Sequence, residues 1–395
     1  MKANPGGAVT GDAILGREDE ISEMWAKLEK RSVILSAERR VGKTSVLRKM
    51  CDHPAKGWIP LFCFVEAARH PIDCVEKIFA EANQLEARSG KGVLLGRIRS
   101  AYQKVAGTEI SGWKLPPLQS DWKRLLNELM ADISECTDNK VVIILDEFPH
   151  MISNIIDDHG GAAGMEFLDT LREIRQKFEP TNQIRFLLSG SIGLHLILQQ
   201  LKSEYGYKGN PTNNMAWKIL AGMTDKDVRL MCRKYLDEEN ISRNETDDFD
   251  KRMAKCTDVL PIYIQHICER FQDSNRQGVT PEDIDLELRE LMDSREIEWF
   301  RNTAERIETY YKKLNADQRA SDILKMLSHK ESFVQEKAII DYIRSQMTVE
   351  HDSEVVSTLE LLLDDNYLDR DTSTGERRYR FKYDIMRRWW KINRG

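Results

Sequence analysis

No apolar run in this 395-residue sequence approaches the ~18–20 residues that a membrane-spanning helix needs. The opening segment, MKANPGGAVTGD, also lacks the apolar centre of a signal peptide, so we expect the protein to be neither secreted nor anchored. The seven cysteines are scattered, odd in number and without a CxxC pair, which argues against zinc sites and disulfides. Together these absences predict a cytoplasmic protein with reduced thiols.

A strong excess of one charge is missing as well. The 59 basic and 65 acidic residues leave a net charge of -6, which does not indicate a nucleic-acid binder, although an average can hide a local patch. The eight histidines are isolated and form no recognisable motif with a nucleophilic serine or cysteine. With 41% hydrophobic and 31% charged residues, the chain has the composition of a globular protein, and its length predicts two or three domains.

The segment from Arg31 to Arg48 carries the most informative pattern in the chain. A short apolar run at residues 33–35 predicts a buried strand, and the turn after it ends in Gly42, Lys43 and Thr44 before a helix-forming segment. This order is typical of a phosphate-binding loop, in which backbone N–H groups and a helix N-terminus surround phosphate oxygens. We expect Lys43 to reach the β- and γ-phosphates of ATP and the Thr44 hydroxyl to bind Mg²⁺.

The loop departs from the usual GxxxxGK[ST] pattern at one position. Ala37 stands where the pattern has its first glycine. A methyl group there could stiffen or shift the loop, which leaves open a protein that binds ATP and hydrolyses it very slowly. Taken alone, GKT after a strand is moderate evidence, because such triplets arise by chance in unrelated chains.

A second segment supplies the other half of such a site. Residues 141–145 form an apolar run that ends in Asp146 and Glu147, as in a buried parallel strand whose carboxyl end binds ligands. We expect Asp146 to hold Mg²⁺ through water and Glu147 to orient or deprotonate the attacking water. The alternative is a buried strand followed by two solvated acids. The phosphate loop upstream favours the functional interpretation, because the two halves complete one site.

Strand-like and helix-like segments alternate up to about residue 222, which predicts a parallel sheet with helices on both faces. The expected strands cover residues 33–35, 60–66, 141–146, 184–191 and 217–220, and a Gly/Ala loop is expected at residues 160–164. From Thr224 the pattern is helical only. Residues 315–395 then combine three helices with a β-hairpin, which is the winged-helix arrangement.

Four segments resemble motifs of the P-loop ATPases of the STAND and archaeal-type AAA+ group, and the resemblance covers most of the chain. They are Leu15-Gly16-Arg17-Glu18, Arg39-Arg40-Val41-Gly42-Lys43-Thr44-Ser45, Leu145-Asp146-Glu147-Phe148-Pro149 and Leu188-Ser189-Gly190-Ser191. The resemblance implies an α/β P-loop NTPase core, an all-α lid and a winged-helix domain, with ATP and Mg²⁺ as cofactors. The predicted division is a mobile N-terminus (1–12), an ATPase core (13–222), a helical lid (223–312) and a winged-helix domain (313–395).

The resemblance also implies roles for single residues. The nucleotide would be bound by Arg17 on its base or ribose side and by Arg40, Val41, Gly42, Lys43, Thr44 and Ser45 in the loop. Ser191, or failing that Ser189, would sense the γ-phosphate. In the lid, Pro261 would pack against the nucleotide, although Val259 stands where glycine is usual. A sensor arginine in the lid has no clear counterpart, and the candidates for an arginine finger are Arg172, Arg175 and Arg185.

The charge of the predicted winged helix bears on nucleic-acid binding. From Glu350 to Asp369, the expected recognition helix and its exit, there are seven acids and no lysine or arginine, so phosphates would repel it. The following segment is basic, and its hairpin could touch phosphates through Arg377, Arg378, Arg380 and Lys382. The alternative is that these groups pair with the acidic helix.

The leading hypothesis is a molecular switch that couples ATP binding and hydrolysis to a protein or nucleic-acid partner, in defence or mobile-element regulation. Such a switch could form a homo-oligomer on binding ATP. The alternative is a DNA-associated AAA+ ATPase, a loader or transposition regulator with DNA-stimulated hydrolysis. A small-molecule kinase is less favoured, because Glu147 suits water activation and the helical C-terminal half exceeds a kinase lid. The sequence identifies neither the partner nor the trigger.

Overall fold

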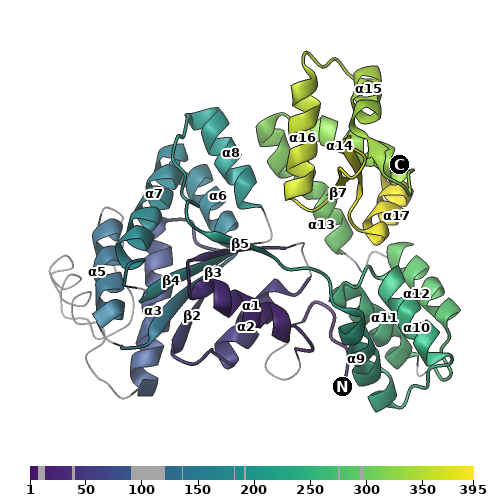
Figure 1. Cartoon of the computed structure of the whole chain (residues 1–395), viewed down its shortest axis with the longest axis horizontal. Helices are drawn as coiled ribbons and strands as arrows, with labels where there is room; N and C mark the ends of the chain where they lie inside the picture. Colours follow the sequence, from purple (N-terminus) through teal and green to yellow (C-terminus); the bar gives the residue numbers. More distant parts are fainter. Residues whose placement is uncertain are drawn as a thin grey trace. The chain divides into compact units, whose positions relative to one another are not determined.

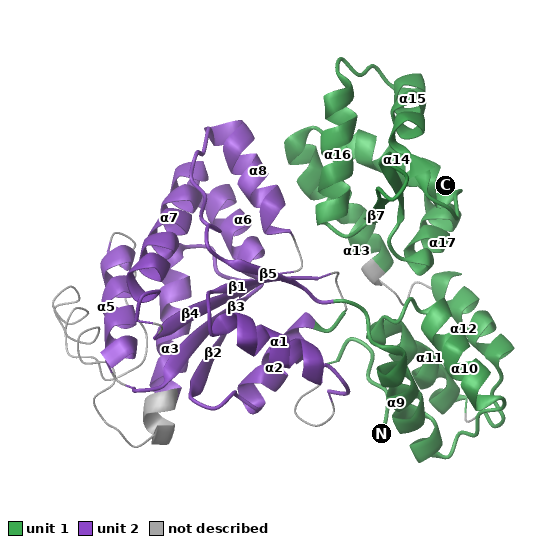
Figure 2. Cartoon of the chain, in the orientation of Figure 1, with its two compact units in different colours: residues 1–9, 38–42, 221–395 green, residues 10–37, 43–220 purple. Residues whose placement is uncertain are grey.

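The computed structural model describes residues 1–7, 14–37, 41–89, 121–135, 137–181, 183–190, 193–274, 276–293 and 298–395. The chain forms two compact units (Figure 2). Unit 2 contains Thr10–Ala37 and Lys43–Leu220, and unit 1 contains Met1–Val9, Glu38–Gly42 and Ala221–Gly395. Each unit has its own buried apolar core.

Unit 2 is built on a five-stranded parallel sheet in the order β2-β3-β4-β1-β5 (Figure 1). The strands are β1 (Val33–Ser36), β2 (Trp58–Phe64), β3 (Lys140–Asp146), β4 (Ile184–Ser189) and β5 (Ala216–Ile219). Each expected strand is therefore found, with small differences at its ends. The central strands β3 and β4 are almost continuously buried, as the apolar runs in the sequence predict for strands covered on both faces.

Helices cover both faces of this sheet. The described helices of unit 2 are α1 (Glu18–Leu28), α2 (Lys43–Asp52), α3 (Pro71–Ser89), α5 (Trp122–Glu135), α6 (Phe148–His159), α7 (Gly161–Phe178) and α8 (Leu194–Tyr205). Val141, Ile143 and Leu145 of β3 lie in one apolar cluster with α3, α5, α6, α7 and α8. Val142 and Ile144 are buried outside that cluster and so face the other side of the sheet, and α1 and α2 pack against β1 and β2. The predicted parallel sheet with helices on both faces is confirmed.

The predicted loop at residues 160–164 is wrong. Gly160 alone, with φ of +83°, separates α6 from α7, and the sequence analysis assigned no helix where α6 lies. Gly161 and Gly164 lie within α7, at positions where the side chains of other residues come very close to the helix backbone. A Cβ atom on Gly164 would come within 2.7 Å of Ile156 Cγ1, and one on Gly161 within 2.4 Å of the Tyr205 ring. These two glycines therefore allow close packing rather than a turn.

Unit 1 is helical from residue 225 to residue 314. Its elements there are α9 (Asp225–Tyr235), the 3₁₀-helix η2 (Asp237–Glu239), α10 (Thr246–Cys256), α11 (Pro261–Asp273), α12 (Pro281–Asp293), α13 (Glu298–Arg306), the π-helix η3 (Ile307–Tyr311) and the 3₁₀-helix η4 (Lys312–Leu314). This agrees with the helical pattern expected after Thr224. No helix in the described part of the chain is long and apolar enough to cross a membrane.

The C-terminal part of unit 1 combines helices with a small antiparallel sheet. The helices are α14 (Asp317–Ser328), α15 (Glu336–Gln346), α16 (Asp352–Asp364) and α17 (Asp384–Asn393). The sheet has the order β6-β8-β7, from β6 (Val334–Gln335), β7 (Leu368–Asp371) and β8 (Arg378–Phe381). The sequence pattern predicts the hairpin β7–β8 and three of the helices, but it predicts neither β6 nor α17. The winged-helix assignment and the boundaries 223–312 and 313–395 stay predictions.

Stacked aromatic rings join α11 to α17 within unit 1. The Tyr263 and Phe300 ring centroids lie 5.5 Å apart, and those of Phe300 and Trp389 lie 5.3 Å apart. All three side chains are buried. The last helix of the chain is therefore packed into the same core as the helix that begins at Pro261.

Candidate nucleotide-binding site

The register of the parallel sheet brings the two predicted halves of the site to one edge. Leu35 of β1 pairs with Ser189 of β4, and Leu145 of β3 pairs with Leu188. Asp146 at the end of β3 is therefore next to Ser189, and both lie at the edge where β1 leads into the phosphate loop. Segments that are about a hundred residues apart in the sequence thus meet at the carboxyl ends of three neighbouring strands.

The phosphate loop ends as helix α2 begins. Gly42 has φ of +94°, and a Cβ atom built on it would meet nothing within 4 Å, so this position needs glycine for its backbone and faces open space. Lys43 is the first residue of α2, and its side chain is buried. Its Nζ atom donates a hydrogen bond of 3.0 Å to the Ala37 carbonyl oxygen. The lysine and the first position of the loop are therefore tied together.

Ala37, which stands in place of the first glycine of the usual pattern, has an unstrained backbone. The described non-glycine residues with positive φ do not include it, so its backbone is in a conformation that any residue adopts. Ala37 directly follows the last residue of β1, and it is buried. The first glycine of the usual pattern is therefore not required here for backbone conformation.

Thr44 and Asp146 make the direct link between the two halves. The Thr44 hydroxyl donates a hydrogen bond of 2.7 Å to Asp146 Oδ2. Asp146 has no exposed surface. Burial raises the pKa of the Asp146 carboxyl, the hydrogen bond from Thr44 lowers it, and the negative charge of Glu147 raises it. A cation beside this carboxyl would favour its ionised form.

Glu147 follows with an unusual backbone. It has φ of +61° and ψ of +33°, a left-handed conformation that costs ~1–2 kcal/mol for a residue other than glycine. It precedes the first residue of α6, and its own N–H donates to Asp146 Oδ1 at 3.2 Å. Its side chain is only 13% exposed, and Oε2 lies 3.9 Å from Nε2 of His150. This turn directs Glu147 away from the straight continuation of β3.

Ser189 is the buried hydroxyl at the end of β4. It faces the Asp146 carboxyl closely enough to lower the pKa of that group, although the two do not form a hydrogen bond of regular geometry. Ser191, the first choice for the sensor, lies outside the described residues, as do Arg39 and Arg40 of the loop.

Arg17 is held near the phosphate-loop helix by a lysine that the sequence analysis did not single out. Lys49 of α2 donates hydrogen bonds of 2.9 Å to the carbonyl oxygens of Ile14 and Gly16 and of 2.7 Å to Glu18 Oε1. Arg17 itself is buried, has φ of +76° and contacts Glu20 Oε1 at 2.8 Å. The segment that contains Arg17 is therefore anchored on α2. The only sequence signal for this contact is the presence of a basic residue on a short helix.

Two arginines considered for a finger are engaged inside unit 2. Arg175 donates a hydrogen bond of 2.6 Å to the Pro211 carbonyl, and burial lowers its pKa to about 10. Arg185 donates to the Leu28 carbonyl at 3.2 Å, and burial lowers its pKa as well. Both side chains bind carbonyl oxygens within their own unit, which argues against either as a finger that reaches another subunit.

Pro261 lies in unit 1, at the first turn of α11. The two residues before Leu260 are strained: Asp258 has φ of +48° and Val259 has φ of +52°, which is unfavourable for a β-branched side chain. Val259 thus adopts the backbone that a glycine at this position would take freely. A Cβ atom on Gly222 would come within 2.5 Å of Val259 Cγ2, so the two positions are in tight contact.

Asp258 connects this loop to the last helix of unit 1. Its Oδ2 atom accepts a hydrogen bond of 2.7 Å from the N–H of Ile385 in the first turn of α17. In the same region, Arg388 of α17 donates to the Cys256 carbonyl at 3.1 Å. Burial raises the pKa of Asp258 to about 6, although the backbone N–H groups of Ile385 and Asp384 lower it.

We therefore predict a pH-dependent stability that Asp258→Asn abolishes. Because the folded-state pKa is raised from 3.8 to about 6, the contribution of Asp258 is fully present below pH 3.8 and is lost as the pH rises through 6. Relative to Asp258→Asn, the wild type should gain about 2 kcal/mol in free energy of unfolding between pH 7 and pH 4. Urea unfolding of both proteins across this range measures the difference, and a difference independent of pH would contradict the assignment.

The donor set at the edge of the sheet fits Mg²⁺ and a nucleoside triphosphate. A threonine hydroxyl and a carboxylate are hard oxygen ligands, and Mg²⁺ is usually held by one or two of these together with water and phosphate oxygens. The described residues contain no cluster of three or more His, Cys, Asp or Glu side chains arranged around a metal position. Among the described residues, Thr44 and Asp146 are therefore the pair whose oxygen atoms suit Mg²⁺.

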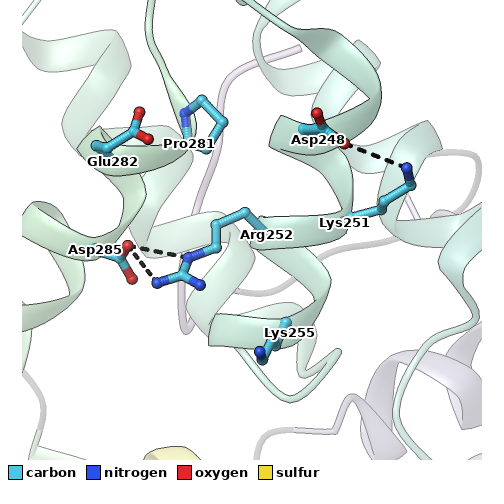
Figure 3. A pocket seen from close by; sticks show the side chains of 7 residues that line it. All are labelled: Asp248, Lys251, Arg252, Lys255, Pro281, Glu282 and Asp285. Atoms are coloured by element: carbon cyan, nitrogen blue, oxygen red, sulfur yellow. Dashed lines mark hydrogen bonds and ion pairs between the residues drawn. The ribbon is translucent and has the colours of Figure 1, made fainter.

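A separate cavity on unit 1, of about 430 Å³, does not have this chemistry (Figure 3). It lies between α10 and the start of α12, and four of its charged groups form two ion pairs with one another. Lys251 contacts Asp248 at 3.3 Å, and Arg252 contacts Asp285 at 2.5 Å. We assign no ligand to it.

Comparison with known proteins supports the assignment of an ATPase site to unit 2. Residues 27–198 match a protein family described as an AAA domain. Residues 27–198 form an AAA-type P-loop ATPase domain. The predicted ATPase is thereby confirmed, and the part that matches includes Lys43, Thr44, Asp146 and Glu147. No curated protein matches the sequence.

Solved structures extend the comparison of the fold. A Walker-type ATPase of Pyrococcus abyssi aligns with a TM-score of 0.65 and 14% identity and covers 97% of each chain. A STAND protein with a tetratricopeptide repeat sensor from Pyrococcus horikoshii aligns over 97% of this chain and 43% of its own, with 15% identity and a TM-score of 0.37. The RuvB Holliday junction branch migration motor of Thermotoga maritima aligns over 92% of each chain, with 11% identity and a TM-score of 0.36. The first of these supports the fold of this AAA-type ATPase along its whole length.

Proposed function

We propose that this ATPase is a nucleotide-driven switch, which binds ATP with Mg²⁺, hydrolyses it and passes its nucleotide state to a partner. The observation that carries the proposal is the hydrogen bond between Thr44 and Asp146, because it joins the phosphate-loop helix to the acidic end of β3. Lys43 adds a positive charge and Glu147 a carboxylate to the same edge of the sheet. These groups form one hydrolytic site.

Within this proposal, the phosphates are bound by the start of α2. Lys43 carries its charge to the β- and γ-phosphates, and backbone N–H groups near Val41, Gly42 and Ser45 surround phosphate oxygens, together with Arg40 beyond the described residues. Mg²⁺, held by Thr44 and through water by Asp146, neutralises charge on the phosphates when it is bound.

Glu147 is the proposed group that acts on water. Its carboxylate orients the attacking water or accepts its proton. Ser189, or Ser191 beyond the described residues, responds to the γ-phosphate from the end of β4. Arg17 lines the base or ribose, which is supported by its anchoring on α2 through Lys49. Pro261 packs against the nucleotide, as the resemblance to the STAND and archaeal-type AAA+ group implies.

The proposal also covers the roles of the domains, the location of the protein and its partner. The core (13–222) carries the site, and the helical lid (223–312) and winged helix (313–395) transmit its state. We propose that the protein acts in the cytoplasm, forms a homo-oligomer when ATP is bound and acts on a protein partner in defence or mobile-element regulation. The stacked rings of Tyr263, Phe300 and Trp389 support transmission between lid and winged helix, because they join α11 to α17.

Two substitutions test the site. Glu147→Gln should lower the rate of ATP hydrolysis by ~100-fold or more while ATP still binds, because it removes the group that acts on water. Lys43→Ala should weaken ATP binding itself, because it removes the charge on the phosphates. Steady-state hydrolysis and equilibrium binding of a fluorescent ATP analogue measure the two effects.

Matched controls are Glu166→Gln and Lys202→Ala, which alter exposed side chains of the same types on α7 and α8. Both should hydrolyse and bind ATP as the wild type does. If Glu147→Gln and Lys43→Ala also behave as the wild type, the site assignment is wrong.

The DNA-associated alternative is weakened by the ion pairs of the hairpin. Arg378 pairs with Asp371, and Arg380 lies 3.7 Å from Asp369, in each case directly across the two strands. Figure 1 shows α16 beside this hairpin, and Arg377 lies 3.9 Å from Glu360 of that helix. The remaining basic group, Lys382, donates to Asn366 Oδ1 at 2.6 Å. A DNA contact would have to replace these partners.

We therefore expect duplex DNA at low salt to leave the hydrolysis rate unchanged. The comparison is with a variant that combines Arg377→Ala, Arg378→Ala and Arg380→Ala, which should hydrolyse ATP at the wild-type rate with and without DNA. Stimulation by DNA that weakens with salt and disappears in this variant would favour the loader or transposition regulator instead.

A further inference from the structure

The carboxylate of Glu147 needs a restraint that its own backbone does not provide. Glutamate has three rotatable side-chain torsions, and a group that acts on water is effective only when it is held close to the productive position. Glu147 occupies the N-cap position of α6, yet its side chain makes no capping hydrogen bond to that helix. A side chain close to the carboxylate is one source of such a restraint.

His150 is placed to supply it. It is the third residue of α6, one turn along from Glu147, so the two side chains lie on the same face of the helix start. His150 Nε2 lies 3.9 Å from Glu147 Oε2, which is within the range of an ion pair when the imidazole is protonated and longer than a hydrogen bond. Both side chains are largely withdrawn from solvent, with 17% and 13% exposed, so water screens their interaction only weakly.

The start of α6 is rigid enough to hold His150 in place. Pro149 fixes the backbone in the first turn, and the Met151 N–H donates to the Glu147 carbonyl at 3.3 Å. Phe148 and Met151, which directly follow Glu147 and His150 in the sequence, have no exposed surface, and the ring of Phe148 lies 6.4 Å from that of Phe167 in α7. Helix α6, which carries His150, is therefore packed into the apolar core at its first turn.

We propose that His150 is a positioning residue, whose imidazole ring holds the Glu147 carboxylate by polar contact through Nε2 at the edge of the sheet where water meets the γ-phosphate. The imidazole acts on Glu147 and not on the nucleotide. The inference rests on the proposed function, because it matters only if Glu147 acts on water. It predicts that His150 affects the rate of hydrolysis and leaves the affinity for ATP unchanged.

Two substitutions of His150 separate positioning from packing. His150→Phe keeps a planar ring but removes both ring nitrogens, and it should lower kcat by ~10–100-fold with KM and the ATP dissociation constant within about twofold of the wild type. His150→Gln keeps an N–H group near the position of Nε2 and should recover most of the lost rate. Both variants should unfold at the temperature of the wild type.

A double-mutant cycle completes the test. In a Glu147→Gln background, His150→Phe should cause no further loss of rate, because the carboxylate that it positions is already gone. A loss that multiplies with that of Glu147→Gln, or a His150→Gln variant as slow as His150→Phe, would overturn the positioning role. Failure of the proposed function would look different, because Glu147→Gln alone would then retain the full rate.

Discussion

The hydrogen bond between Thr44 and Asp146 is the contact on which the rest of the site depends. It spans 102 positions of sequence and forms only if β1 and β3 are parallel, with β4 between them, so that their carboxyl ends meet at one edge. A fully buried carboxylate is costly unless it receives hydrogen bonds or a nearby positive charge. The Thr44 hydroxyl and the charge of Lys43 both favour the ionised form of Asp146, so the phosphate loop and the acidic strand stabilise one another.

The neighbourhood of Asp146 also shows why the site lies in strained backbone. Strand β3 is buried on both faces and ends in a charge, and the chain must turn at once so that the next carboxylate avoids the core. The left-handed conformation of Glu147 makes that turn in a single residue. Its cost is offset by the apolar first turn of α6, where Phe148 and Met151 are fully buried. Hydrolytic geometry and core packing are thus set by the same few residues.

The amino-acid sequence predicts the parts of this structure that are governed by local pattern. The apolar runs before Ala37 and Asp146 predict buried strands, and the alternation with helices predicts the parallel sheet. Features that depend on tertiary contact are not visible in the pattern. Gly161 and Gly164 suggest a loop because glycine is common in turns, yet here neighbouring side chains leave no room for a Cβ atom. Lys49 and Asp258 are ordinary surface residue types until the fold supplies their partners. For His150, the only sign in the sequence of its contact with Glu147 is the spacing of three residues.

The contact between Gly222 and Val259 restricts how the two positions can change in evolution. Val259 is in a left-handed conformation, and its side chain fills the space that a Cβ atom of residue 222 would occupy. A side chain at position 222 therefore requires that position 259 lose its own, and also that the backbone oxygens of residues 258 and 259, 3.2 and 3.3 Å from the added Cβ atom, shift slightly. Position 222 is a single residue past the point where the chain leaves unit 2, and position 259 precedes the start of α11 by two residues. Relatives with glycine at position 259 should thus be the ones that vary at position 222, which makes this pair a marker of how the connection to the helical region diverged.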